Sequence, residues 1–258
     1  MFPILLKVGP FTFYTYGLLV ATGFLAGVAL ITYQAKKEGV DPQKAMDLSF
    51  YALAAAILGS RILYIIVNYD VFIESPLRVF KIWEGGLVFY GGFIGAALAG
   101  FWYVRKEKLD TWHMADLAAP SIALGHAIGR WGCLASGSCY GKPTSSWFGI
   151  TFTDVHAIAP LGIPLFPSQI VESIMEFSIF LLLIAVRPHR KFKGQLFIMW
   201  LLLYAVGRFI LEFFRGDDRG FIIPNVLSTS QGVAVVVFVA GLFLLRRLAR
   251  AGPASAGR

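Results

Sequence analysis

Long apolar segments recur along the whole chain, and they constrain its fold more than any other feature of the sequence. A helix that crosses the hydrocarbon core of a bilayer needs about 20 residues, and its backbone groups must be satisfied within the segment. Segments of this kind lie near 13–33, 48–67, 86–104, 115–131, 169–186, 195–214 and 230–248. The fourth is the weakest of the seven, because it is short and is broken by Pro120.

The composition agrees with a membrane protein. Of the 258 residues, 57% are hydrophobic and 15% are charged, and the mean hydropathy is +0.68. Soluble domains carry about a quarter charged residues. We therefore predict an all-α integral membrane protein with seven transmembrane helices in a single membrane-embedded domain, 1–258. The first segment is longer than the about 7–15 apolar residues of a signal peptide, so we expect it to be retained as a span.

The basic residues predict the orientation of these helices. If the N-terminus is outside, the inside segments carry fourteen of the 23 Lys and Arg residues and the outside segments carry six. The positive-inside rule expects this asymmetry. We therefore predict a C-terminus in the cytoplasm, an outward loop at about 132–168 and a short basic cytoplasmic tail at 246–258. This distribution accounts for most of the net charge of +8, and no nucleic-acid partner is expected.

The outward loop is rich in aromatic residues, together with prolines and glycines. It contains Trp147, Phe148, Phe152 and Phe166. Aromatic side chains favour the boundary between membrane and water, so we expect the loop to lie there. An ordinary connecting loop remains an alternative for its middle part.

Ionisable residues within or at the edges of the spans are the candidate functional residues. A charge at the bilayer centre costs about 2.5–3.5 kcal/mol on insertion scales, so such a residue normally has a partner or a ligand. The set is Arg61, Asp116, Arg130, Glu172, Glu176, Arg208 and Glu212. Three intramembrane arginines favour an anionic ligand, because an arginine fork donates parallel hydrogen bonds to phosphate. An Arg208–Glu212 pair that neutralises only its own burial remains an alternative.

The stretch from His126 to Gly141 concentrates these features. His126 lies one helical turn before Arg130 and shares a helix face with it. The glycines here let the backbone approach whatever Arg130 holds, for which we expect an anionic lipid headgroup. In the sixth span, Tyr204, Arg208 and Glu212 share a face in the same way.

Two further pairs of residues have ordinary structural interpretations. Gly91 and Gly95 form a GxxxG pair, which is typical of close helix packing, and Tyr90 just before them faces either a cavity or the aromatic belt. Cys133 and Cys139 form a disulfide in an oxidising compartment or remain buried thiols. They have no second pair at metal spacing, so no zinc site is predicted.

Several motifs occur in an order seen in a known family of enzymes. Gly129-Arg-Trp-Gly132 is followed by Gly137 and Gly141, and Tyr204-Ala-Val-Gly-Arg-Phe-Ile-Leu-Glu-Phe-Phe-Arg215 lies near the C-terminus. Further matching positions are Tyr16-Gly17, Ser60-Arg61, Asp116 and Pro167-Ser-Gln-Ile-Val-Glu172. Over nearly its whole length the chain resembles the prolipoprotein diacylglyceryl transferases, with Arg130 and Arg208 at the positions of the family's two key arginines.

The sequence departs from the family pattern at three positions. The family's His-Gly-Gly, whose histidine is a proposed base, is Tyr90-Gly91-Gly92 in this chain. Cys133 stands in place of an asparagine and Ser138 in place of a glutamate. These changes alter the acceptor side of the chemistry. Another base is therefore needed, and we expect it to be His126, Tyr90 or Glu212, with His126 first because imidazole titrates near neutrality.

The resemblance implies a reaction in the bacterial inner membrane. A diacylglyceryl group passes from phosphatidylglycerol to the lipobox cysteine of a prolipoprotein signal peptide, and glycerol 1-phosphate is released. No metal or organic cofactor is implied. The expected catalytic residues are Arg130, Arg208, His126, Tyr90 and Glu212. The expected phosphatidylglycerol-binding residues are Arg130, Arg208, Tyr16, Gly129, Gly132, Gly141, Arg61, Tyr204, Glu172 and Asp116.

Three alternatives to this function remain. A divergent member of the same scaffold would use another donor or acceptor. An anion transporter would use similar arginines, but the two halves of the chain lack the broken-helix repeats common in transporters. A purely structural membrane protein leaves three buried arginines without a purpose.

Overall fold

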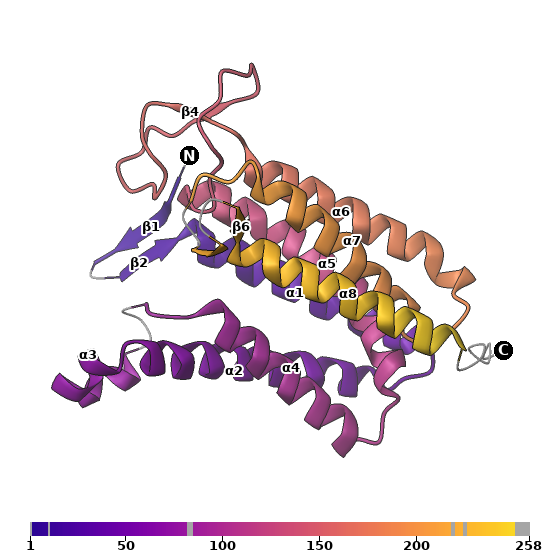
Figure 1. Ribbon diagram of the computed structural model, residues 1–258. Helices are drawn as coiled ribbons and strands as arrows, with labels where there is room; N and C mark the ends of the chain where they lie inside the picture. The colour runs from indigo at the N-terminus through magenta and orange to yellow at the C-terminus, as the bar shows by residue number, and fades with distance from the viewer. Residues whose placement is uncertain (1, 10, 82–84, 218–219, 224–225, 251–258) are drawn as a thin grey trace. The chain divides into compact units, whose positions relative to one another are not determined.

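A computed structural model describes residues 2–9, 11–81, 85–217, 220–223 and 226–250 (Figure 1). Among these residues, seven long helices correspond to the seven predicted spans. They are α1 (Thr15–Lys37), α2 (Pro42–Val67), α4 (Phe89–Lys106), α5 (Thr111–Ser136), α6 (Ser168–Val186), α7 (Gln195–Glu212) and α8 (Thr229–Arg250). The short helices are α3 (Tyr69–Glu74), η1 (Pro76–Phe80) and η3 (Arg187–His189).

Short strands in the connections were not predicted from the sequence. They form three two-stranded antiparallel sheets. The pairs are β1 (Ile4–Val8) with β2 (Phe11–Tyr14), β3 (Ile150–Thr151) with β4 (Pro164–Leu165), and β5 (Phe221–Ile223) with β6 (Leu227–Ser228). Apolar periodicity does not reveal strands of two to five residues, because they are too short to carry a pattern.

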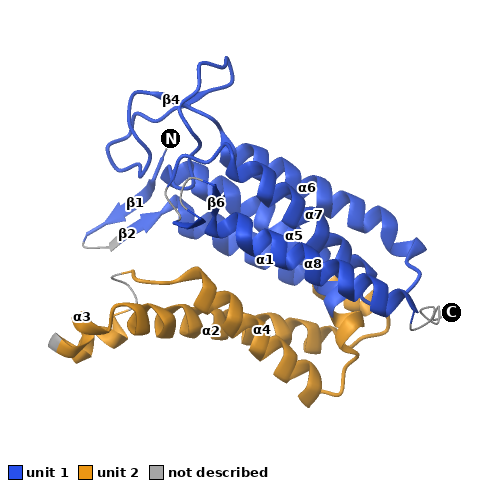
Figure 2. Cartoon of the chain, viewed as in Figure 1, with its two compact units in different colours: residues 1–30, 115–258 blue, residues 31–114 orange. Residues whose placement is uncertain are grey.

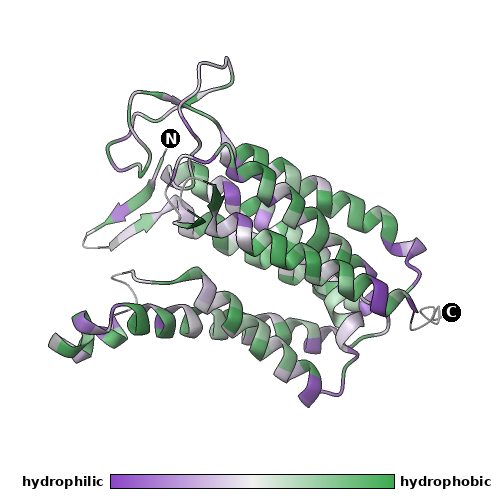
Figure 3. Cartoon of the chain, in the orientation of Figure 1, coloured by the Kyte–Doolittle hydropathy of each residue, from purple (hydrophilic) through white to green (hydrophobic). Residues whose placement is uncertain are grey.

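Five helices of the described chain are long and apolar enough to cross a membrane. They are α1, α2, α7, α8 and the combined segment of α6 and η3, Ser168–His189. Figure 3 shows that the long helices are largely apolar, with hydrophilic residues concentrated at several helix ends. The protein is therefore a helical, multi-pass membrane protein. Of the basic residues that predicted the orientation, Arg219 and Arg258 lie outside the described residues, as does 251–258 of the basic tail; residues 246–250 belong to α8.

Internal contacts divide the chain into two compact units (Figure 2). Unit 1 comprises residues 1–30 and 115–258, and unit 2 comprises residues 31–114.

In unit 2, α2 packs closely against α4 through small residues. A Cβ atom added to Gly59 would lie 2.3 Å from the carbonyl oxygen of Gly91, and one added to Gly95 would lie 2.3 Å from that of Ala55. Real side chains do not approach backbone this closely, so the two helices depend on these glycines. The interpretation of Gly91 and Gly95 as a helix-packing pair is confirmed.

In unit 1, α6 packs against α7, and α7 packs against α8. An apolar cluster joins α5, α6 and α7 and comprises Ala119, Ala123, Ile179, Leu183, Leu196 and Trp200. Helix α5 runs without interruption through Pro120, so the predicted break at that residue is wrong. The helix loses one N–H donor there, but the packing of the neighbouring Ala119 and Ala123, both fully buried, holds it in place.

The loop after α5, which was predicted to face outward, starts later than predicted and is partly packed. Helix α5 continues to Ser136 and ends at Gly137, whose φ of +70° suits glycine, so the loop begins at 137 rather than 132. Phe152 is only 2% exposed and packs in a cluster with Leu134 and Leu165. Trp147, in contrast, is 94% exposed.

Candidate functional site

Charged side chains from α5 and α6 meet inside unit 1. His126 and Arg130 lie one turn apart on α5, and Glu172 and Glu176 lie one turn apart on α6. The two helices are in contact here, since the Ser173 hydroxyl donates to the carbonyl of Ala127 at 2.8 Å. Helical spacing on each chain segment therefore presents two ionisable groups to two others.

Arg130 is held by a carboxylate and an imidazole. Its Nη2 lies 2.9 Å from Oε1 of Glu172. Its Nε and Nη2 lie 3.0 and 2.8 Å from Nε2 of His126. Glu172 is fully buried, so its charge is strongly stabilised by this guanidinium.

His126 links Arg130 to a second carboxylate. Its Nδ1 lies 2.7 Å from Oε1 of Glu176. Arginine has only donors, so Nε2 of His126 must accept the bonds from Arg130. Nδ1 then carries the proton and donates a hydrogen bond to Glu176. The ring is thereby assigned to the neutral Nδ1–H tautomer.

Arg215, which follows α7, joins the cluster from the loop side. Its Nη1 lies 3.5 Å from Oε2 of Glu172, while its Nε and Nη2 lie 2.7 and 2.8 Å from the two carboxylate oxygens of Asp217. A bridge between Gly141 and Arg215 positions it. Glu172 is consequently shared between Arg130 and Arg215.

Arg208 forms the ion pair with Glu212 that its spacing allowed. Its Nη2 lies 2.6 Å from Oε2 of Glu212 and donates to the Ser230 hydroxyl at 3.1 Å. Its Nη1 is buried and has no hydrogen-bond partner among the described residues. Arg208 therefore keeps a donor for a ligand even though its charge is balanced by Glu212.

Tyr204 connects Arg208 with the Arg130 side of the site. It lies one turn before Arg208 on α7, its ring meets that of His126 edge-on with centroids 5.6 Å apart, and it stacks on Trp200 at 5.8 Å. The sequence placed Tyr204, Arg208 and Glu212 on one face, and packing brings that face to His126.

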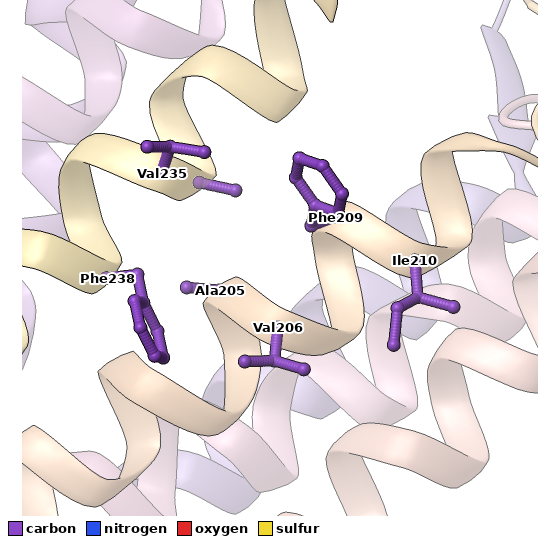
Figure 4. A pocket seen from close by; sticks show the side chains of 7 residues that line it. Ala205, Val206, Phe209, Ile210, Val235 and Phe238 are labelled. Carbon is purple, nitrogen blue, oxygen red and sulfur yellow. The ribbon is translucent and has the colours of Figure 1, made fainter.

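An apolar pocket of about 250 Å³ lies between α7 and α8, in the turns of α7 that flank Arg208 (Figure 4). Its lining residues are Ala205, Val206, Phe209, Ile210, Ala234, Val235 and Phe238. No polar atom is exposed in its wall, and its size and chemistry suit a hydrocarbon chain.

The predicted glycines differ in their surroundings. A Cβ on Gly129 would meet no atom within 4 Å, so its backbone faces open space. A Cβ on Gly132 would lie 3.2 Å from the carbonyl oxygen of Tyr16, and one on Gly141 would lie 2.3 Å from that of Phe166. Gly132 thus allows α5 to approach Tyr16 of α1, while Gly141 serves the packing of the loop.

Asp116 is not brought into the cluster. It lies fourteen residues before Arg130 on α5, about 21 Å along the helix axis. Its carboxylate accepts hydrogen bonds from the backbone N–H groups of Gly194 and Phe197 at 2.8 and 3.1 Å. These groups begin α7, so Asp116 satisfies the N-terminus of another helix rather than a ligand.

Arg61 and Tyr90 belong to unit 2. The guanidinium of Arg61 donates to backbone carbonyls, at 2.7 Å to Gly85 and 3.2 Å to Val79, and also to those of Arg78, Lys81 and Gly86. These bonds hold the backbone at both ends of the connection, at 78–81 and 85–86, and occupy the donors that a phosphate would use. Tyr90 is 41% exposed and its ring packs edge-on against Phe89.

Two cysteines that are not joined in a disulfide border the cluster. Nη1 of Arg130 lies 3.8 Å from the Cys133 sulfur, and the Cys133 thiol hydrogen bonds to Cys139. That hydrogen bond, followed by the positive charges of Arg215 and Arg130, lowers the pKa of the Cys139 thiol. Cys133, which stands where the family pattern has an asparagine, therefore makes a polar contact with Arg130.

The sequence placed Glu176 among the candidate ionisable residues without a specific role and did not place Arg215 there, although both contact predicted site residues. Glu176 lies one turn after Glu172, and Arg215 ends the motif that contains Arg208. In the whole cluster, three arginines and His126 contact four carboxylates. A phosphate that binds Arg130 would have to replace part of its contact with Glu172, whereas Nη1 of Arg208 has no partner among the described residues. Among the described residues, no group of three His, Cys, Asp or Glu side chains is placed to hold a metal ion.

Comparison with known proteins gives a consistent family. Residues 3–247 match the model of the prolipoprotein diacylglyceryl transferases. The chain is 36% identical to a phosphatidylglycerol–prolipoprotein diacylglyceryl transferase of Clostridium tetani over 244 residues, 95% of this chain and 96% of the relative. It is 35% identical to a second such transferase of Clostridium perfringens (90% and 89%) and 33% identical to that of Halalkalibacterium halodurans (93% and 84%). The chain therefore belongs to the prolipoprotein diacylglyceryl transferase family.

Proposed function

We propose that this protein transfers a diacylglyceryl group from phosphatidylglycerol to the lipobox cysteine thiol of prolipoproteins, the first step of bacterial lipoprotein maturation. Relatives that match about nine-tenths of the chain or more carry this activity in their names. The observation that carries the proposal is the cluster around Arg130, because a guanidinium on an apolar helix that is held beside buried carboxylates is expected to serve an anionic ligand such as a phospholipid headgroup.

The proposed setting is the bacterial inner membrane, crossed seven times by one domain over residues 1–258, with the N-terminus outside and the C-terminus in the cytoplasm. Basic residues at three helix ends support this orientation: Lys36 and Lys37 in α1, Arg105 and Lys106 in α4, and Arg247 and Arg250 in α8. These ends share the cytoplasmic side in the proposed topology, as the positive-inside rule requires.

Arg130 and Arg208 are proposed to bind the phosphate of the donor. Arg130 would exchange part of its contact with Glu172 for the phosphate, and Nη1 of Arg208 would gain its missing acceptor. Both groups are held in place before the donor arrives, so they stabilise the negative charge that develops on the leaving phosphate. The pocket between α7 and α8 beside Arg208 supports a lipid donor, because it accommodates an acyl chain.

In the proposed reaction, the sulfur of the acceptor cysteine attacks the carbon of the diacylglyceryl group that is bonded to the phosphate oxygen. A C–S bond forms, the C–O bond to phosphate breaks, and glycerol 1-phosphate leaves. The thiol proton passes to a base. His126 is our first candidate, since its Nε2 lone pair becomes available when Arg130 turns toward the phosphate. Glu212 and Tyr90 are the alternatives.

The test is transfer of labelled diacylglyceryl from phosphatidylglycerol to a lipobox peptide by the purified protein, with Arg130→Ala as the comparison. We expect the wild type to modify the peptide cysteine and Arg130→Ala to be at least about 10²-fold slower while retaining its fold. Transfer by Arg130→Ala at the wild-type rate would contradict the headgroup role. Binding of phosphatidylglycerol without any transfer by the wild type would contradict the reaction and direct attention to another acceptor.

A further inference from the structure

Glu176 is a buried acid that the proposed phosphate binding does not use. It is fully buried on α6, and its Oε2 has no hydrogen-bond partner among the described residues. Its Oε1 contacts Nδ1 of His126 at 2.7 Å. A carboxylate is costly to bury unless it has a charged or hydrogen-bonding partner. The contact with His126 is therefore the interaction that explains why Glu176 is buried here.

The groups that face His126 define which ring nitrogen carries the proton. Arg130 approaches from its own helix, Glu172 and Glu176 approach from α6, and the ring of Tyr204 approaches from α7. Glu176 accepts only at Nδ1, and Arg130 donates only at Nε2. The two contacts agree on one tautomer, with the proton on Nδ1 and the lone pair on Nε2.

We propose that Glu176 is a positioning residue that acts through His126. By holding the proton on Nδ1, it keeps the Nε2 lone pair directed at Nε and Nη2 of Arg130 in the resting site. The imidazole thereby fixes the plane of the guanidinium. The same lone pair is left free to accept a proton once Arg130 engages the donor phosphate. This inference rests on the proposed function for its consequence in catalysis, but not for the tautomer itself.

The tautomer is tested without the reaction by ¹⁵N NMR of protein labelled at its four histidines, with the His126 signals identified by their loss in His126→Gln. We expect the wild type to have a protonated Nδ1 and an unprotonated Nε2. In Glu176→Leu, Nδ1 loses its acceptor and only Arg130 still favours an unprotonated Nε2, so we expect the Nδ1 signal to lose the shift of a hydrogen-bonded N–H and a fraction of the rings to carry the proton on Nε2. A protonated Nε2 in the neutral wild-type ring, or an unchanged spectrum in Glu176→Leu, would overturn the proposal.

The catalytic consequence is tested by kcat and KM of transfer in Glu176→Gln and Glu176→Leu, with Glu107→Gln as the matched control. Glu107 pairs with Lys44 in unit 2, and its change should leave both constants unaltered. The amide oxygen introduced by Glu176→Gln still accepts from Nδ1–H, so kcat should fall less than about 10-fold. Leucine accepts no hydrogen bond, so the ring is no longer oriented in Glu176→Leu, and kcat should fall about 10²-fold with little change in KM for the donor.

The two measurements separate the possible failures. Equal losses of kcat in Glu176→Gln and Glu176→Leu would overturn the proposal, because an amide acceptor at position 176 would then not preserve the orientation of the ring. If the wild type transfers nothing from phosphatidylglycerol, the proposed function fails, and the NMR spectrum alone decides the role of Glu176. Thermal unfolding in detergent checks that each variant retains its fold.

Discussion

At the residue scale, the arginines of the cluster differ in what a phosphate would displace. Arg130 and Arg215 both contact Glu172, so the Glu172 carboxylate would keep Arg215 as a cationic partner at 3.5 Å after Arg130 moved away. Arg208 already has a donor without a partner among the described residues and need not leave Glu212. The free-energy cost of binding an anion is lower in such a site, because no carboxylate is left buried without a cation.

His126→Gln separates the two proposed uses of the imidazole. The glutamine amide oxygen can accept from Arg130 but cannot take a proton near neutral pH. We therefore expect binding of phosphatidylglycerol to stay within about three-fold of the wild type, while transfer falls about 10²–10⁴-fold, as for loss of a general base. Lipid binding and transfer are measured on the same preparation. Wild-type transfer by His126→Gln would assign the base to another residue.

The alkylation rate of Cys139 should depend little on pH. The lowered pKa of this thiol means that the thiolate persists as the pH falls from about 8 to about 6, whereas an ordinary thiol with a pKa near about 8.5 loses reactivity about tenfold per pH unit there. The rate with iodoacetamide is followed by peptide mass spectrometry. Cys133→Ala removes the first cause of the shift and should restore part of the pH dependence. A tenfold fall per unit in the wild type would contradict this expectation.

At the element scale, helix spacing and close approach between helices build the site. Each of α5, α6 and α7 presents ionisable groups four residues apart, and glycines allow α5 to approach α1: a Cβ on Gly23 would lie 2.6 Å from the carbonyl oxygen of Gly125. Asp116 fixes the beginning of α7, the helix that carries Arg208. Residues distant from the chemistry therefore set the alignment of the helices that perform it.

The pocket between α7 and α8 gives a prediction at this scale. Ala234 is 5% exposed and belongs to its wall, so Ala234→Phe should fill the space that an acyl chain would occupy. We expect transfer from a long-chain donor to fall about tenfold and transfer from a short-chain donor to fall less, since burial of each CH₂ contributes about 0.8 kcal/mol. Rates with the two donors provide the measurement. Val236→Phe, at an exposed α8 position outside the pocket, is the control. Equal losses for both donors would contradict the acyl-chain assignment.

At the scale of the whole molecule, the proposed topology makes the loop after α5 accessible from outside the cell. Trp147→Cys and Lys191→Cys, each in a Cys133→Ser/Cys139→Ser background, place one exposed cysteine in this loop and one between α6 and α7. We expect the thiol-free background to retain transfer. A membrane-impermeant maleimide added to intact spheroplasts should label position 147 but not 191 until the membrane is opened. The reverse pattern would show that the orientation is opposite to the one proposed. Labelling of both positions would contradict the proposal that α6, which lies between them, crosses the membrane.

The sequence by itself determined the seven long helices and the family. Apolar length and helical spacing are local properties, so the helix positions and the Arg208–Glu212 pair follow from residues close in the chain. The short strands did not follow, because they are too short to carry an apolar pattern. The extension of α5 to Ser136 and its continuity through Pro120 did not follow either, because tertiary packing overrides local propensity there.

Only the tertiary structure decided which charged side chains meet. Local spacing cannot show that Glu172 and Glu176 of α6 face His126 and Arg130 of α5, since 42 residues separate Arg130 from Glu172 along the chain. Arg61 is as buried as Arg208, yet backbone carbonyls occupy its guanidinium. A buried charge must find a partner, but the identity of that partner depends on how distant helices pack.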